Sequence, residues 1–340
     1  MGRSIIEDRC QVEAAIAHEN LQIFPVVAAH YPDTTGFLTL EAGLTSGAVV
    51  ITEVGAGGPG SNVADAARVN GLAVVNKSSK SLLLLGGEVV RGGKQDRVIA
   101  EDVLIAAGTS APLEVFCVES GRWAYRSRQF AKSGDYMAKP SVRGRAAFDK
   151  DQSAVWHEVG RARESVAACI SSPALLQAVS STTSYAEVFD NEDVVKELDK
   201  VAGWDRFRDA ALRTLRDRRA CGSVVAIAGR FAWAEVFASA DLFSSYMTKL
   251  VNSFTAESLT SGKASGSVSP DQADAFLRDW HSTSERIRRE PDLFEYLEAE
   301  AATWHGYELR SLLPGYSGGL HTVKQARLPE IQDRPRSMYR

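Results

Sequence analysis

A short, fully apolar run that ends directly in charged residues constrains this chain more than any other stretch. Leu82 to Leu85 is too short to span a membrane and is followed by the glycine pair Gly86-Gly87, so it predicts a strand buried on both faces. Charged residues and a second glycine pair follow from Glu88 to Arg97. Because glycine permits close approach and sites are usually built at strand ends, we expect this segment to have a polar role.

A second strand is expected to bring further polar residues to the same place. The alternation from Leu113 to Glu119 puts Val115, Cys117 and Glu119 on one face, and the polar turn that ends in Trp123 follows. Guanidinium and ammonium groups bind phosphate, an indole stacks on a base, and a glutamate can act as general acid or base. The predicted site residues are Glu88 and Glu119 for catalysis, and Arg91, Lys94, Gln95, Arg97, Arg122 and Trp123 for ligand binding.

Two interpretations of these residues stay open. In the first, the charged groups meet in one water-accessible hollow that holds a ligand. In the second, Glu88 and Glu119 pair with Arg91, Arg97 or Arg122 in a structural network, since such networks also perturb titration. Cys117 lies in an apolar strand, which favours a packing role over a nucleophilic one.

Composition excludes several classes of protein. The chain has 340 residues and a formal net charge of -4, so it has no general electrostatic attraction for nucleic acid or an anionic membrane. Four cysteines lie far apart, and with no signal peptide they indicate reduced thiols in a cytoplasmic protein. No segment approaches transmembrane length, and no motif has the spacing of metal ligands. The sequence assigns no metal and no cofactor.

Changes in periodicity predict an α+β fold. Residues 1–19 are expected to form a helix, residues 20–150 an antiparallel, β-rich lobe with the charged motifs, and residues 151–328 a helical lobe that returns strands to the body. The helical lobe includes a β-hairpin from Val224 to Phe237 and closing strands, residues 20–328 are expected to form one integrated domain, and residues 329–340 form a loose tail.

Two stretches suggest nucleotide binding without establishing it. Gly55 to Gly60 matches the GxGxxG dinucleotide fingerprint, but little room remains for a crossover helix before Leu72, so a loop between antiparallel strands is expected. The span from Arg122 to Arg145 is rich in basic residues and contains Asp135 as its one acid. A phosphate-binding loop and a solvated loop both fit it.

The chain resembles the ADP-ribosylglycohydrolase and rhodanese-phosphatase-superfamily-associated protein domain. The likeness is carried by Val50 to Glu53, Gly86 to Arg97, Cys117 to Trp123, Gln152 to Trp156 and Val224 to Phe237, and it spans roughly residues 21–328. The sequence has Asp96 where the family tends to carry asparagine, and Ser120 where glutamine is common. The resemblance implies association with NAD and ADP-ribose metabolism and supplies no catalytic residue.

Two functional hypotheses follow. The first is a cytoplasmic protein that binds an anionic, nucleotide-like ligand such as ADP-ribose or an NAD-derived compound. If this protein is an enzyme, it is a hydrolase or transferase that acts on nucleotide or ADP-ribose-type substrates. The second is a non-enzymatic scaffold or self-assembling subunit, a homo-oligomer, in which the charged cluster is structural.

Overall fold

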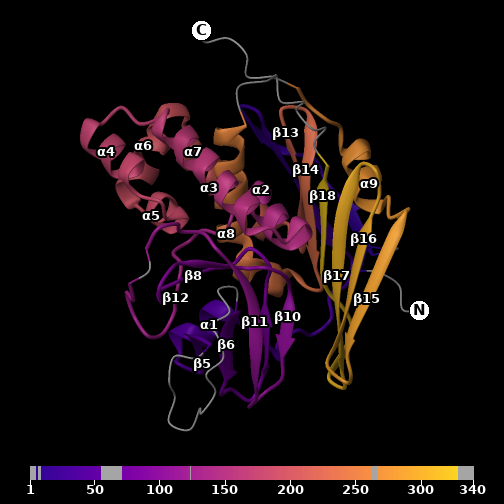
Figure 1. The fold of residues 1–340 in the computed structure, drawn as a ribbon. Helices are drawn as coiled ribbons and strands as arrows, with labels where there is room; N and C mark the ends of the chain where they lie inside the picture. The colour runs from indigo at the N-terminus through magenta and orange to yellow at the C-terminus, as the bar shows by residue number, and fades with distance from the viewer. Residues whose placement is uncertain (1–4, 7–8, 55–70, 123, 262–265, 328–340) are drawn as a thin grey trace.

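One large antiparallel sheet joins strands from both ends of the chain. The computed structural model describes residues 5–6, 9–54, 71–122, 124–261 and 266–327. The large sheet has nine strands, in the order β1-β3-β13-β14-β18-β17-β16-β15, with β2 paired to β3 (Figure 1). Their bounds are β1 Cys10–Val12, β2 Ile16–His18, β3 Leu21–Ala28, β13 Gly222–Ile227, β14 Arg230–Phe237, β15 Ser284–Glu290, β16 Phe294–Glu300, β17 Trp304–Leu313 and β18 Tyr316–Ala326.

Two smaller sheets contain the charged motifs. A six-stranded sheet has the order β12-β8-β9-β11-β6-β5, and a three-stranded sheet has the order β10-β7-β4. Their bounds are β4 Phe37–Thr39, β5 Val49–Glu53, β6 Gly71–Asn76, β7 Ser81–Leu84, β8 Val89–Arg91, β9 Arg97–Ile99, β10 Val103–Ile105, β11 Ser110–Cys117 and β12 Ala131–Lys132. The apolar run in β7 divides its side chains between two cores, Leu82 and Leu84 in one and Leu83 and Leu85 in the other. The predicted burial on both faces is therefore confirmed.

Helices α3 to α7 cluster on one side of the large sheet, whereas α9 lies on its other side and α1 lies beside β5, as Figure 1 shows. The bounds of the helices are α1 Leu40–Thr45, α2 Pro140–Gly144, α3 Gln152–Ala167, α4 Pro173–Ser181, α5 Tyr185–Phe189, α6 Glu192–Ala202, α7 Trp204–Asp217, α8 Ala240–Thr260 and α9 Pro270–Arg278. Ser239 caps α8 by accepting a hydrogen bond from the Leu242 amide. Most residues of α8 are buried because it packs against α3, α7 and the large sheet.

The α+β fold with antiparallel sheets and C-terminal strands is confirmed, and so is the hairpin formed by β13 and β14. β5 and β6 pair antiparallel, as expected, which excludes a parallel crossover between them. The GxGxxG stretch itself lies outside the described residues. The part of the chain that the structure describes contains no helix long and apolar enough to cross a membrane.

The helix predicted at the N-terminus is wrong, and two other local features were not predicted. The predicted helix over residues 1–19 is replaced at Cys10–Val12 and Ile16–His18 by β1 and β2, because pairing with β3 overrides the helical spacing of their apolar residues. Within the helical lobe, α5 and α6 are separate helices because Asn191 caps α6. β15 was not predicted, since all its residues are exposed and no apolar alternation marks it.

A buried ionic network joins the large sheet to the charged motif. Arg143 of α2 lies within hydrogen-bond distance of both carboxylate oxygens of Glu235 on β14, at 3.4 and 3.2 Å. His321 of β18 lies 3.3 Å from Glu235 and contacts Asp102 at 2.5 Å. Burial opposes charging of His321, but Asp102 and Glu235 outweigh it and raise the pKa of the imidazole. Two acids therefore face two bases at this junction.

We expect Arg143→Met to destabilise the protein by roughly 3–5 kcal/mol, because it leaves the buried Glu235 carboxylate without its guanidinium. Chemical denaturation measures the change. Arg145→Met is the matched control: Arg145 is 47% exposed and pairs with Asp149 and with Glu158, which keeps Arg161 as a second partner, so its loss should cost about 1 kcal/mol or less. Equal effects of the two substitutions would contradict a special role for the network.

Candidate functional site

The glycines of the motif are required by the protein's own packing. Gly87 has φ +97°, and a Cβ there would lie 2.5 Å from the Arg143 side chain. Gly93 has φ +50°, and a Cβ there would lie 2.5 Å from the Phe130 ring and 2.7 Å from Glu53 Oε1. Both positions need left-handed backbone and close approach, which glycine supplies without strain. The close approach expected for a ligand is made at these two glycines by side chains of the chain itself.

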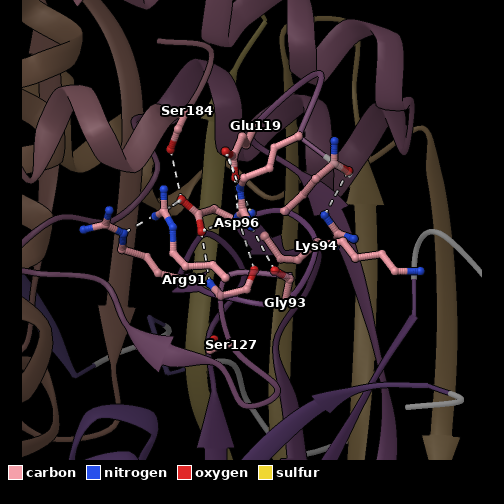
Figure 2. Close-up of polar contacts among 12 residues, drawn as sticks. Arg91, Gly93, Lys94, Asp96, Glu119, Ser127 and Ser184 are labelled. Atoms are coloured by element: carbon pink, nitrogen blue, oxygen red, sulfur yellow. Dashed lines mark hydrogen bonds and ion pairs between the residues drawn. The ribbon is translucent and has the colours of Figure 1, made fainter. Parts of the chain in front are cut away.

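Asp96 is the centre of the charged cluster drawn in Figure 2, and its side chain is fully buried. Oδ1 accepts a hydrogen bond from the Gly92 amide at 3.0 Å, and Oδ2 accepts one from the Ser184 hydroxyl at 2.9 Å. Burial raises the pKa of the Asp96 carboxyl, and the nearby Glu119 carboxylate raises it further. Neither Asp96 nor Ser184 was among the site residues predicted from the sequence.

Glu119 and Arg122 form a bidentate ion pair with each other. Glu119 accepts hydrogen bonds from Arg122 Nε at 2.7 Å, Arg122 Nη2 at 2.6 Å and the Asp96 amide at 3.0 Å. Arg122 Nη1 donates to the carbonyl oxygens of Gly93 and Ala124. A bidentate pair with these further bonds holds the turn after β11 against the motif. Neither side chain is left with much hydrogen-bonding capacity for a ligand.

Arg91 differs from Arg122 because its guanidinium is only loosely paired. Its Nε lies 3.8 Å from Asp96 and its Nη1 lies 3.6 Å from Asp190, so both contacts exceed hydrogen-bond length. Its side chain is 31% exposed. Within the described residues, this guanidinium donates no hydrogen bond.

The remaining basic residues of the motif lie beside Glu53. Arg97 Nη1 donates to Gln95 Oε1 at 3.2 Å, and Arg97 Nη2 lies 3.9 Å from Glu53 Oε1. The Lys94 amide donates to the same Glu53 oxygen at 2.7 Å, while its ammonium group lies 5.2 Å from the centre of the Tyr125 ring. Gln95 and Arg97 are buried. These residues extend the cluster inward and line neither of the two cavities described below.

Glu88 stands apart from Glu119. It accepts a hydrogen bond from the Leu85 amide, and its other oxygen lies 3.8 Å from Lys249 of α8. Burial raises the pKa of Glu88 to about 7, opposed by the Lys249 ammonium. The two glutamates predicted to share acid–base work therefore have separate surroundings.

Basic residues of the span from Arg122 to Arg145 are largely paired with acids elsewhere in the chain. Arg126 pairs with Glu187 at 2.5 Å, Lys132 pairs with Glu41, and Lys139 pairs with Glu257 at 3.5 Å. These pairs account for much of the local positive charge without a bound phosphate. Trp123, predicted to stack on a base, lies outside the described residues.

Two cavities flank the segment that runs from Thr182 into α5. The larger has a volume of about 310 Å³. It is lined by Arg91, Ala178, Val179, Thr182, Ala186, Glu187, Asp190 and Asn191. The smaller has a volume of about 130 Å³. It is lined by Ser120, Trp156, Val159, Gly160, Arg163, Thr183, Ser184, Tyr185, Val188 and Phe189.

Of the predicted site residues, only Arg91 lines either cavity. The structure brings Arg91 and Arg122 together around Asp96, with Glu119 bound to Arg122, but places Glu88 elsewhere. Sequence reasoning missed Thr182, Glu187 and Asp190 because they follow an ordinary amphipathic stretch with no motif. The one residue in the sequence that could have pointed to this region is Asp96, which lies inside the motif and accepts a hydrogen bond from Ser184.

Metal ligation finds no support among the described residues, which contain no group of three or more His, Cys, Asp or Glu side chains placed to hold an ion. All four cysteines are free thiols. Burial raises the pKa of the Cys117 thiol, which disfavours the thiolate that nucleophilic chemistry needs.

The chain belongs to the family of the ARG and Rhodanese-Phosphatase-superfamily-associated Protein domain, whose model matches residues 9–315. This match confirms the resemblance inferred from the motifs. Comparisons with curated proteins and with solved structures found no match.

We expect Glu88→Gln to remove a pH-dependent loss of stability. The raised pKa means that the folded protein binds more protons than the unfolded chain between pH 4.5 and about 7, so stability falls as pH rises through that window. The total loss from Glu88 is about 3 kcal/mol. Denaturation curves across this range should be flatter for Glu88→Gln, which keeps an acceptor for the Leu85 amide.

The matched control is Glu192→Gln, since Glu192 is 85% exposed. It should follow the wild-type pH profile. An unchanged profile for Glu88→Gln would show that Lys249 keeps Glu88 ionised throughout and would contradict the prediction.

Proposed function

We propose that this chain is a cytoplasmic protein that binds an anionic, nucleotide-like compound of the ADP-ribose type in the larger cavity. The observation that carries the proposal is Arg91. Its guanidinium borders the cavity of about 310 Å³ and has only long ion pairs, so it retains donors for a phosphate. A volume of this size is at the lower end of the range for small-molecule sites, ~300–1,000 Å³.

The acids of this cavity suit the sugar of such a ligand. Glu187 and Asp190 line the wall beside Arg91. Both oxygens of Glu187 are already bound, to Arg126 and Thr182, whereas Asp190 Oδ1 has no hydrogen bond among the described residues and can accept one from a ribose hydroxyl. Asn191 uses its amide oxygen to cap α6, which leaves its amide N–H groups for a ligand acceptor. The Arg91 guanidinium and the free oxygen of Asp190 thus favour a ligand with both phosphate and hydroxyl groups over a simple anion.

We propose binding of this ligand and no chemical conversion of it. Glu119 is occupied by Arg122, and Glu88 lies beside Lys249, so neither glutamate reaches this cavity. The family supports an association with ADP-ribosylglycohydrolase-like proteins through its name. Free thiols at all four cysteines agree with the proposed reducing compartment.

A second candidate is a non-enzymatic scaffold or self-assembling subunit, in which the charged cluster is structural. The mutual saturation of Glu119 and Arg122 favours it, because such a pair stabilises the turn after β11 without a ligand. Under this alternative no nucleotide-like compound shifts the melting temperature, and light scattering reports a homo-oligomer.

We expect ADP-ribose to bind the wild-type protein and Arg91→Gln to weaken its affinity about tenfold or more, since a charged hydrogen bond to phosphate is lost. Isothermal titration calorimetry measures the dissociation constants. Ribose 5-phosphate should lose affinity on the same substitution, whereas ribose should not, because it lacks the phosphate.

Arg128→Gln is the matched control, since Arg128 is an exposed arginine of the same basic span and lines neither cavity. It should bind ADP-ribose as the wild type does. The proposal fails if the wild type binds neither ADP-ribose nor ribose 5-phosphate, or if both arginine variants bind equally well.

A further inference from the structure

The smaller cavity contains an arginine that no acid neutralises. Arg163 of α3 donates from Nη1 to the Thr182 carbonyl oxygen at 3.1 Å. Within the described part of the chain it makes no ion pair, and its other guanidinium nitrogens make no hydrogen bond. No aspartate or glutamate lines this cavity. The cavity thus differs from the larger one, where two carboxylates accompany Arg91.

The other walls of the smaller cavity are aromatic and aliphatic, with hydroxyl groups at one side. Trp156, Tyr185 and Phe189 supply rings, and Val159 and Val188 supply aliphatic surface. The Thr183 hydroxyl donates to the Ser120 carbonyl oxygen, and the Ser184 hydroxyl donates to the Asp96 carboxylate. The Ser120 hydroxyl, in contrast, has no hydrogen bond among the described residues. A ring-lined cavity with a guanidinium and a hydroxyl suits a flat ligand with an anionic end.

The volume limits that ligand to a single ring. An engineered apolar cavity of ~150 Å³ in another protein holds benzene, so about 130 Å³ accepts one six-membered ring and excludes a whole nucleotide. The presence of glycine at position 160 is consistent with a cavity that holds a ring. It stands inside α3, lines the cavity, and an added Cβ would meet nothing within 4 Å. A glycine here weakens the helix and leaves the space open.

We infer that the cavity between α3 and α5 binds a small aromatic carboxylate, with its carboxylate on Arg163 and the Ser120 hydroxyl and its ring against Trp156. The site is separate from the one proposed around Arg91. It is joined to that site by the shared wall at Thr182, whose carbonyl oxygen Arg163 holds. The inference does not rest on the binding of ADP-ribose.

The test uses benzoate and nicotinate as probes, with inorganic phosphate and benzamide as comparisons, on the full chain. Ligand-observed NMR and calorimetry measure binding. We expect both carboxylates to bind the wild type, benzamide to bind more weakly because it lacks the charge, and phosphate not to compete with either carboxylate. Arg163→Gln should weaken the carboxylates about tenfold or more, as expected for loss of a charged hydrogen bond.

Arg161→Gln is the matched control, because Arg161 lies on the same helix, is exposed and pairs with Glu158. It should leave benzoate binding unchanged. Gly160→Ala supplies a second variant that does not depend on the charge. It should raise the melting temperature of the unliganded protein, because alanine favours the helix, while it lowers benzoate affinity by filling the cavity.

Absence of carboxylate binding to the wild type overturns the inference. So does equal benzoate affinity in wild type, Arg163→Gln and Gly160→Ala. Competition by phosphate would assign the guanidinium to a tetrahedral anion and would also overturn it. Because Arg91→Gln should leave benzoate binding intact, failure of this site and failure of the ADP-ribose site are distinguishable.

Discussion

The buried ionic network of Arg143, Glu235, His321 and Asp102 fixes the charged motif relative to the large sheet. Asp102 Oδ1 accepts a hydrogen bond from the Gly86 amide at 2.8 Å, at the point where the apolar strand β7 ends. Gly87 lies against the Arg143 side chain in left-handed backbone. Removing four charged groups from water is costly, and their attraction offsets that cost only when every partner is in place. The motif therefore begins at a position set by residues from three distant parts of the chain.

Charge density alone does not distinguish a structural cluster from a binding site. The pair formed by Glu119 and Arg122 contains short contacts that use most of its donors and acceptors. The network around Glu235 is buried and borders neither cavity, although Arg143 Nε and His321 Nε2 have no hydrogen bond within the described part of the chain. Arg91 and Arg163 belong to the opposite case, because each lines a cavity and has donors without hydrogen bonds among the described residues. Since a buried or half-buried donor without a partner is unfavourable, unused capacity at a cavity indicates a ligand better than an abundance of charge does.

The sequence predicted features that depend on local pattern. The leucine run of β7 and the hairpin of β13 and β14 were expected because apolar residues and turn residues mark each of them. The motif residues around Asp96 were expected to meet because glycines and charges follow a buried strand. The family resemblance indicated that the separate motifs belong to one domain, but it did not indicate how their residues are arranged in space.

Features that depend on distant pairing were not predictable in the same way. β1 and β2 have helical spacing, yet β3 offers them an edge to pair with, and that pairing decides their structure. Glu88 lies nine residues from Arg97 in sequence, but Lys249 of α8 is its closest cation. Both cavities include residues from the segment between Ala178 and Asn191, which has no motif. Long-range contacts leave little trace in a single sequence.

The segment from Thr182 to Ser184 links the two cavities through bonds made on both sides. The Thr182 hydroxyl donates to Glu187 in the larger cavity, while its carbonyl oxygen accepts from Arg163 in the smaller one. The Ser184 hydroxyl donates to Asp96 and also caps α5 by accepting from the Glu187 amide at 3.2 Å. Through the bond between Ser184 and Asp96, the charged motif helps to hold this wall in place. The groups best placed to meet a ligand then lie on either side of that wall, outside most of the residues that first identify the family.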